Sequence, residues 1–469
     1  MILLGTGSGM NIVGAMQERN PDIKVAIIDK DDPGGICLTR GCIPSKLLLY
    51  PAEVVRTVQS AAQFGVEAPL KAVHFEHVME RMRQMISKDI EEVRHTLSHA
   101  PNVNYYHAQA EFVGPYTLKV GNDVLKAPMI LLCTGSRPQV PPIKGLDKAG
   151  YLSSDTVLGL HKLPAAVGII GGGYVAAEYG HFFASMGSKV TILGRQPQFL
   201  PQEDPEIAEM ARAEMSRNMT ILTNTQVVEV EHSMLGKKSI IGIDRTTGQK
   251  YTVPVDEILV ATGRASNADL LHPERSGILV DQNGWIGTDE RLETAAPGIW
   301  AFGDANGKYM FKHVANYESA VVFYNAVQKK SVAVDYRAVP HAVFTHPEIA
   351  SVGMQEKEAM QTIGKENLLL GRAHFDDTAK GQAMNATGLV KVVAKLDHET
   401  IVGAHIIGPQ ASVLIQELVT LMYAGGSASA IKNGMHIHPA LSEVVERAVS
   451  ALMPVDQYYH MMTHEETTK

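Results

Sequence analysis

The amino-acid sequence predicts an α/β protein with two parallel-sheet domains and a separate C-terminal α+β domain. Two strand–glycine turn–helix–strand units of the same kind lie 166 residues apart, and each is typical of a parallel-sheet domain that binds a dinucleotide. Beyond about Val339 the pattern changes, because strands at 388–394 and 401–407 alternate with helices near 411–423 and 441–452. At about 150 residues per domain, a chain of this length has room for three domains.

The first unit starts with the apolar strand Ile2–Leu4 and the turn Gly5-Thr6-Gly7-Ser8-Gly9. We expect a helix from about residue 11 to 19, then a strand that ends at Asp29. Glycines let a pyrophosphate approach the backbone, and the helix N-terminus offers N–H groups and the positive end of its dipole. Asp29 lies 24 residues after Gly5, near the spacing of an acidic residue that binds ribose hydroxyls. Met10 replaces the third glycine of G-x-G-x-x-G, which predicts looser packing of the helix on the strand.

The second unit repeats this order. A strand at 167–170 leads into Gly171-Gly172-Gly173, a helix follows from Tyr174 to about Met186, and a strand runs from Lys189 to Leu193. Each unit is also followed by a strand that ends in Thr-Gly, first at Thr134-Gly135 and then at Thr262-Gly263. Two such fingerprints in one chain favour two Rossmann-like dinucleotide sites over purely structural glycine turns.

Composition excludes several classes of protein. The chain has 42 Lys and Arg against 50 Asp and Glu, a net charge of −8, so it has no basic excess for nucleic acid. No apolar run is long enough to span a bilayer, and the N-terminus lacks the features of a signal peptide. Three cysteines cannot build an extracellular disulfide scaffold. We therefore expect a cytoplasmic protein that binds neither nucleic acid nor membrane.

Two cysteines, Cys37 and Cys42, are the most informative residues. They lie in the segment GGICLTRGCIPSK with the spacing C-x4-C, which is not the C-x2-C of a zinc site, so we expect no metal. A helix that begins near Cys42 would place the thiols at a helix N-terminus, where thiolate is favoured. Two thiols that can close a disulfide form a two-electron redox couple.

Together these residues resemble the class I pyridine nucleotide–disulfide oxidoreductases, which include dihydrolipoamide dehydrogenase, glutathione reductase, mycothione reductase and mercuric reductase. The resemblance covers essentially the whole chain. It implies FAD at the first glycine turn, NAD(H) or NADP(H) at the second, and a C-terminal domain that forms a homodimer. The implied segments are 1–147 for the first part of the FAD-binding domain, 148–265 for the NAD(P)-binding domain, 266–336 for the central FAD-binding part and 337–469 for the dimerisation domain.

The resemblance also implies roles for the dithiol and its neighbours. Cys37 is then the interchange thiol that reacts with substrate, and Cys42 is the thiol beside the flavin that forms the charge-transfer contact. Lys46 would lie beside flavin N5, paired with Glu178 from the helix of the second unit. A Lys–Glu pair of purely structural importance is the alternative.

A second flavin signature agrees with the first. Residues Thr294 to Asp304 match T-x-x-P-x-[IL]-[WY]-A-x-G-D, and Asp304 would accept hydrogen bonds from the ribityl chain. The segment 310–318, with Ala315, resembles the start of the helix under the flavin ring. The resemblance thus assigns FAD to Gly5, Gly7, Gly9, Asp29, Lys46, Thr134, Gly135, Asp304 and Ala315. It assigns the nicotinamide coenzyme to Gly171, Gly173, Tyr174, Glu178, Arg195 and Gly263.

A histidine motif near the C-terminus supplies the candidate acid/base. The segment 435–443, MHIHPALSE, resembles the family's H-P-x-x-x-E. His438 would then be the acid/base that moves the proton, and the Glu443 carboxylate would orient the His438 ring. In the family this histidine reaches the dithiol of the other subunit, so each active site is built from two chains. We also expect a cis His438–Pro439 bond.

The motifs that bear on the substrate conflict, and together they favour dihydrolipoamide dehydrogenase over a reductase of a small disulfide or a mercuric reductase-like protein. Cys-Ile-Pro-Ser-Lys together with His-Pro-Ala-Leu-Ser-Glu favours dihydrolipoamide dehydrogenase, with a lipoyl-domain substrate and a 2-oxoacid dehydrogenase complex as partner. The opening Gly-Thr-Gly-Ser-Gly resembles mycothione reductase, which favours a small disulfide as substrate. The stretch 199–205, FLPQEDP, resembles mercuric reductase, but the C-terminal tail lacks the cysteine pair that would deliver Hg²⁺. A redox-sensing dimer without enzymatic activity is the alternative outside these classes.

Coenzyme preference is open. The strand of the second unit ends at Gly194, 23 residues after Gly171, where an NAD-specific site would carry Asp or Glu. Arg195 follows and could bind a 2′-phosphate, although Pro201 stands where glutathione reductase-like sites carry a second arginine. We therefore expect use of both NAD(H) and NADP(H), with NADP(H) tolerated better than in typical dihydrolipoamide dehydrogenases.

Overall fold

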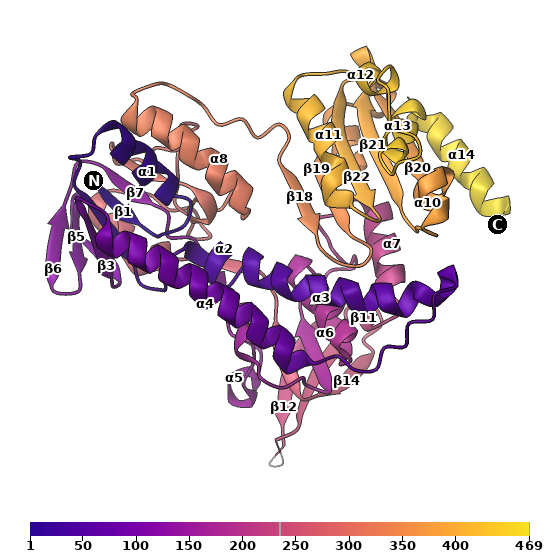
Figure 1. Cartoon of the computed structure of the whole chain (residues 1–469), viewed down its shortest axis with the longest axis horizontal. Helices are drawn as coiled ribbons and strands as arrows, with labels where there is room; N and C mark the ends of the chain where they lie inside the picture. The colour runs from indigo at the N-terminus through magenta and orange to yellow at the C-terminus, as the bar shows by residue number, and fades with distance from the viewer. Residues whose placement is uncertain (234–235, 469) are drawn as a thin grey trace.

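The computed structural model describes residues 1–233 and 236–468. Figure 1 shows the N-terminal sheet and the C-terminal sheet on opposite sides of the molecule, with the second domain below and between them. Two long helices, α3 (Cys42–Ser60) and α4 (Phe75–His99), run across the lower part of this arrangement. The α/β class with two parallel sheets and a C-terminal α+β domain is confirmed.

The N-terminal domain is built on a five-stranded parallel sheet in the order β17-β7-β1-β2-β3. Its strands are short and apolar, as expected for a parallel sheet covered on both faces. They are β1 (Ile2–Leu4), β2 (Val25–Asp29), β3 (Val103–His107), β7 (Ile130–Leu132) and β17 (Ile299–Ala301). Leu3 and Ile27 pack against α1 (Met10–Arg19) and α8 (Lys312–Val322), whereas Ile2 and Leu4 face the antiparallel sheet of β4 (Ala110–Gly114), β5 (Thr117–Val120) and β6 (Asp123–Lys126).

The close approach of α1 to the sheet falls at Gly9 rather than at residue 10. A Cβ added at Gly9 would lie 2.4 Å from the side chain of Leu3 and 2.8 Å from the sulfur of Cys133. Met10 is the first residue of α1 and packs half-buried against the same core. The expectation that Met10 loosens the packing is therefore wrong, because the contact is made one residue earlier.

The second domain has a four-stranded parallel sheet in the order β11-β10-β9-β15. Its strands are β9 (Ala166–Ile170), β10 (Lys189–Leu193), β11 (Thr220–Leu222) and β15 (Glu257–Val260). Its helix α6 (Tyr174–Met186) is buried around most of its circumference, because it lies between this sheet and α3. Further elements are α5 (Leu146–Ala149), α7 (Pro205–Ser216), the antiparallel strands β12 (Thr225–His232), β13 (Lys238–Asp244) and β14 (Lys250–Val255), and the pair β8 (Ser136–Pro138) and β16 (Arg264–Ser266).

The C-terminal domain is a six-stranded antiparallel sheet in the order β18-β19-β22-β21-β20-β23. The strands are β18 (Pro340–Val343), β19 (Ile349–Gly353), β20 (Leu368–His374), β21 (Leu389–Lys395), β22 (Ile401–Ile407) and β23 (Met453–Pro454). One face packs against α11 (Ala411–Tyr423) and α13 (Glu443–Ser450). The other helices are α9 (Glu356–Thr362), α10 (Ala379–Ala383), α12 (Ser429–Lys432) and α14 (Val455–Thr468). Over the described part of the chain, every helix is too short or too polar to cross a bilayer.

Candidate active site

A cavity of about 1180 Å³ connects the first glycine turn with the two cysteines. Twelve of the predicted site residues line it: Gly5, Gly7, Asp29, Cys37, Cys42, Lys46, Thr134, Gly135, Tyr174, Glu178, Asp304 and Ala315. The structure therefore brings the residues predicted for FAD and for the dithiol into one space. Gly9 is not among these lining residues; it packs against Leu3 and Cys133.

The walls of the cavity fit a dinucleotide. The first glycine turn and the start of α2 (Gly35–Thr39) meet backbone to backbone, because a Cβ on Gly35 would lie 2.7 Å from the Cα of Gly7. Gly5 has a φ of +99° and leaves no room for a side chain against the carbonyl of Cys133. The buried hydroxyl of Thr134, on the wall, has no hydrogen-bond partner within the described residues. A bound FAD would occupy this narrow, glycine-lined space and would give the Thr134 hydroxyl a hydrogen-bond partner.

Asp29 and Asp304 both line this cavity. The Asp29 carboxylate accepts hydrogen bonds from the backbone N–H of Thr6 at 2.9 Å and from its hydroxyl at 2.6 Å. Asp304 lies in a short 3₁₀ turn, Gly303–Asn306, and accepts a hydrogen bond from the Ser136 hydroxyl at 2.5 Å. Each carboxylate oxygen has two lone pairs, so both groups keep capacity for ribose or ribityl hydroxyls.

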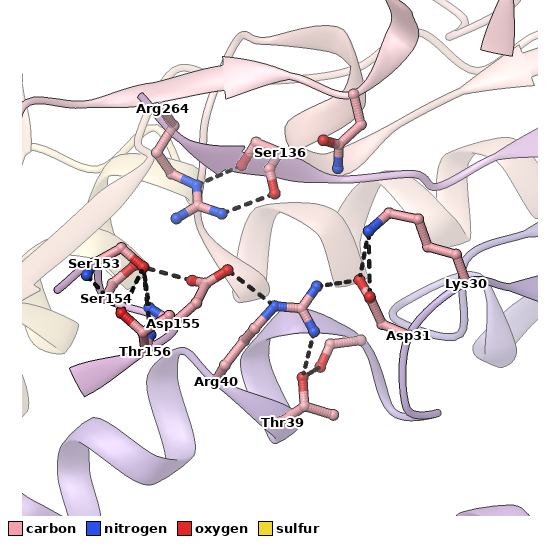
Figure 2. A network of polar contacts seen from close by, with 12 residues as sticks. Lys30, Asp31, Thr39, Arg40, Ser136, Ser153, Ser154, Asp155, Thr156 and Arg264 are labelled. Atoms are coloured by element: carbon pink, nitrogen blue, oxygen red, sulfur yellow. Dashed lines mark hydrogen bonds and ion pairs between the residues drawn. The ribbon is translucent and has the colours of Figure 1, made fainter. Parts of the chain in front are cut away.

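An arginine that the sequence interpretation missed joins the first domain to the second. The Arg40 guanidinium contacts the carboxylate of Asp31 at 2.5 Å and that of Asp155 at 3.2 Å, as Figure 2 shows. Burial opposes ionisation of Asp31, but Arg40 and Lys30 hold the pKa of that carboxyl below its ordinary value. In the same view Arg264 donates to the hydroxyl of Ser136, the group that contacts Asp304. These contacts fix the loop after β2 and the edge of the cavity.

The two cysteines form a hydrogen-bonded dithiol. Cys37 lies in α2, and Cys42 is the first residue of α3, so the predicted helix start is confirmed. Both are free thiols in the structure. The hydrogen bond from Cys37 lowers the pKa of Cys42 to about 7, against the effect of burial and with the help of the Lys46 charge. The same hydrogen bond and burial raise the pKa of Cys37. Cys42 is therefore the thiolate of the pair, which the dipole of α3 also favours.

Lys46 and Glu178 meet across the domain boundary, as predicted. The Lys46 ammonium lies 2.9 Å from each carboxylate oxygen of Glu178 and 4.5 Å above the ring of Phe344. Glu178 also accepts a hydrogen bond from the backbone N–H of Phe344 at 3.1 Å. This pair connects α3, α6 and the segment after β18 at the wall of the cavity.

His438 and Glu443 also pair as predicted, but away from this cavity. His438 Nδ1 lies 2.8 Å from Glu443 Oε1, and the backbone N–H of Ala440 donates to the other oxygen at 3.0 Å. These two hydrogen bonds lower the pKa of Glu443. The His438–Pro439 bond is cis, as predicted. The His438 side chain is 71% exposed and is not part of the cavity lining among the described residues.

The second glycine turn is not part of the cavity lining within the described residues, whereas Tyr174, which follows it directly, is. Gly171 has a φ of +132°, and a Cβ there would lie 2.1 Å from the carbonyl oxygen of Ala261. Gly173 precedes α6, and Gly263 follows β15 with a φ of +117°. Arg195, the second residue after β10, is exposed. These positions agree with a dinucleotide turn at the carboxyl ends of parallel strands.

A second arginine, also missed from the sequence, lies beside Arg195. Arg245 comes from the turn between β13 and β14, and its guanidinium donates to the backbone carbonyl of Arg195 at 3.2 Å. The neighbouring Asp244 carboxylate accepts from the backbone N–H groups of Thr246 and Thr247, at 2.9 and 2.7 Å. Two guanidinium groups therefore share the strand end at which Gly194 replaces a carboxylate.

Comparison with family models covers most of the chain. Residues 2–319 match the model described as pyridine nucleotide-disulphide oxidoreductase. Residues 339–449 match the dimerisation domain of the same family.

Named relatives match over nearly their whole length. Mycothione reductase from Mycobacterium tuberculosis is 35% identical, with 96% of this chain and 98% of the relative covered. Dihydrolipoyl dehydrogenase from Synechocystis is 33% identical, with 96% and 97% covered. Among solved structures, the HOCl-induced flavoprotein disulfide reductase RclA from Escherichia coli is 28% identical with a TM-score of 0.84, and 96% and 99% of the two chains are covered.

Proposed function

Because this chain belongs to the class I pyridine nucleotide–disulfide oxidoreductases, we propose that it is an NADP(H)-dependent flavoenzyme that reduces a low-molecular-weight disulfide through Cys37 and Cys42. The family uses FAD and NAD(P)H as cofactors and carries a dimerisation domain. The hydrogen-bonded dithiol on the cavity wall is the observation that carries the disulfide chemistry. The cationic strand end supports the choice of coenzyme and, with it, the direction of reaction.

The dithiol is arranged for exchange with an external disulfide. Cys37, once deprotonated, attacks one sulfur of the substrate and releases the first product thiol. The Cys42 thiolate then attacks the mixed disulfide at Cys37, which releases the second thiol and closes the Cys37–Cys42 disulfide. FAD, when bound, passes the two electrons of a hydride from NADPH to this disulfide.

His438 supplies the proton in this proposal. Its Nδ1 is held by the ionised Glu443 carboxylate, so its Nε2 is the nitrogen that exchanges protons with thiols. The surrounding segment carries the exposed apolar residues Met435 and Ile437, which a second copy of the chain would cover. We therefore place His438 at the dithiol of the partner subunit, with the active site shared in the homodimer.

The coenzyme assignment follows from charge. A carboxylate at the end of β10 would select NAD(H) by accepting from both ribose hydroxyls and by repelling a 2′-phosphate. Gly194 removes that carboxylate, and Arg195 with Arg245 offers guanidinium groups that suit a phosphate. Arg245 adds a second guanidinium beside Arg195, although it comes from a different part of the chain. Two arginines at this strand end support binding of NADP(H) more strongly than Arg195, which the sequence analysis identified, does alone.

Dihydrolipoamide dehydrogenase is the second candidate. The His-Pro-Ala-Leu-Ser-Glu segment and a relative at 33% identity favour it. In that case the substrate is a dihydrolipoyl group, NAD⁺ or NADP⁺ is the electron acceptor, and a 2-oxoacid dehydrogenase complex is the partner.

One steady-state assay matrix separates these candidates. It crosses dihydrolipoamide, lipoamide, mycothione and glutathione disulfide with NAD(H) and NADP(H). The proposal requires the highest kcat/KM for a small-thiol disulfide with NADPH. A highest value for dihydrolipoamide with NAD⁺ would contradict it and establish the dehydrogenase. Capture of a peripheral subunit-binding domain in a pulldown would add the complex as a partner.

A further inference from the structure

A row of polar side chains crosses the C-terminal sheet on the face opposite to α11 and α13. Adjacent strands place these residues directly opposite one another, because the register pairs His341 with Ser351, Ser351 with His405, His405 with Lys391, and Lys391 with Arg372. Their neighbours along each strand point to the apolar core, as the two-residue period of a strand requires. The sheet therefore carries one continuous polar row from β18 to β20.

The start of α7 and the two residues before it meet this row with three carboxylates. Glu203 accepts from Ser351 at 2.7 Å and contacts His341 at 2.8 Å. Asp204 lies 3.0 Å from the Lys391 ammonium. Glu206 lies 2.7 Å from the guanidinium of Arg372, at the far end of the row. The side chains of Glu203 and Asp204 are 0% exposed, so this is a buried contact between the second and C-terminal domains.

Only one end of the row reaches the cavity. His341 lines the cavity wall together with Tyr174 and Phe311. Its ring lies between theirs, with its centroid 5.3 Å from Tyr174 and 5.8 Å from Phe311 and almost parallel to the Phe311 ring. Tyr174 is the first residue of α6, directly after the second glycine turn.

We propose that Glu203 and His341 are positioning residues for the nicotinamide coenzyme, because they hold Tyr174 in the wall of the cavity where the coenzyme enters. This inference rests on the proposed function, in which the second glycine turn binds NAD(P)H. Neither residue needs to touch the coenzyme. Glu203 fixes the His341 ring, and that ring provides the surface on which Tyr174 packs.

The surroundings of Glu203 support this role. A carboxylate with no exposure is stable as an anion only when its oxygens are hydrogen-bonded, and Glu203 uses both oxygens, one toward His341 and one toward Ser351. Burial, the Glu203 charge and a hydrogen bond to Glu203 all raise the pKa of Tyr174. Glu203 is therefore in contact with both rings and fixes one relative to the other.

The test measures coenzyme binding directly, by calorimetric titration of the oxidised holoenzyme with NADP⁺. We expect His341→Ala and Glu203→Ala each to raise the Kd about fivefold, which corresponds to about 1 kcal/mol and to the loss of one aromatic contact. Glu203→Gln keeps a hydrogen-bond acceptor for His341 and a partner for Ser351, so its Kd should stay within about twofold of the parent.

Two comparisons make the result specific. Arg372→Met removes an ion pair at the other end of the same row, four strands or about 19 Å away, and should lower the melting temperature without changing the Kd. In a Tyr174→Ala background, His341→Ala should have no further effect on the Kd, since His341 acts through Tyr174. Flavin content and melting temperature show whether each variant is folded.

The outcomes separate the inference from the proposed function. An unchanged Kd in folded His341→Ala and Glu203→Ala, additive effects of His341→Ala and Tyr174→Ala, or an equal increase in Arg372→Met would each overturn the positioning role. A parent enzyme whose flavin is not reduced by NADPH or NADH would instead overturn the proposed function.

Discussion

The ionisation of Cys42 offers a quantitative test of the site. The structure lowers its pKa to about 7 from an ordinary value of 9.0, and the two largest lowering causes are the Cys37 hydrogen bond and the Lys46 charge. At pH 7 a thiol with a pKa of about 7 is about half ionised, whereas one with a pKa of about 9 is about 1% ionised. The reduced enzyme should therefore hold about fifty times more thiolate at Cys42 than an unperturbed cysteine would.

The sign of the pH dependence follows directly. Thiolate should be present above pH 7 and should be lost as the pH falls below 7, because Cys42 takes up a proton there. The assay is a pH titration of the thiolate absorbance of the two-electron-reduced protein under anaerobic conditions. Lys46→Met removes one lowering cause and should move the midpoint upward.

Two variants identify which sulfur titrates. Cys42→Ser should abolish the ionisation near pH 7: it removes the hydrogen bond between the two thiols, but burial alone still raises the pKa of the remaining Cys37. Cys133 does not interfere, since burial raises its pKa well above the ordinary range. A midpoint near pH 9 in the parent, or a midpoint near 7 that survives Cys42→Ser, would refute the assignment of Cys42 as the thiolate.

Three other predictions follow from the same geometry. Cys37→Ser should retain the flavin and lose disulfide exchange, so wild-type-like turnover in this variant would contradict the proposed exchange. Arg195→Ala and Arg245→Ala should each raise KM for NADPH about tenfold, or about 1.4 kcal/mol, and leave KM for NADH nearly unchanged; an equal effect on both coenzymes would remove that arginine from phosphate recognition. Mixing inactive Cys37→Ser and His438→Ala subunits under exchange conditions should restore one working site in each heterodimer, and a mixture that stays inactive would show that the site is not shared.

Local rules made the two nucleotide-binding units predictable. Apolar runs such as Ile2-Leu3-Leu4, the glycine turns and the following helices are encoded within about thirty residues, and the structure has them at the expected places. The start of α3 at Cys42 could be predicted for the same reason. The pairing of Lys46 with Glu178 spans 132 residues and was available only from the family resemblance.

The contacts that the sequence did not reveal are long-range and polar. Arg245 reaches Arg195 from a turn fifty residues later, and Glu203 meets His341 over 138 residues. Lys391 lies among valines in β21, and the two-residue period of a strand therefore predicts that the sheet face carrying Lys391 is exposed to solvent. In the structure this face is buried against the start of α7, where Lys391 pairs with Asp204. Such contacts depend on how domains pack, and a single sequence holds no periodic signal for them.

If two electrons from NADPH reach the Cys37–Cys42 pair, the number of free thiols in the denatured subunit should rise by two. The chain has three cysteines, so the oxidised, denatured subunit should show one free thiol, from Cys133. After anaerobic reduction with one equivalent of NADPH, we expect three thiols per subunit in the parent and no increase in Cys37→Ser. Flavin bleaching without the appearance of two new thiols in the parent would contradict the account.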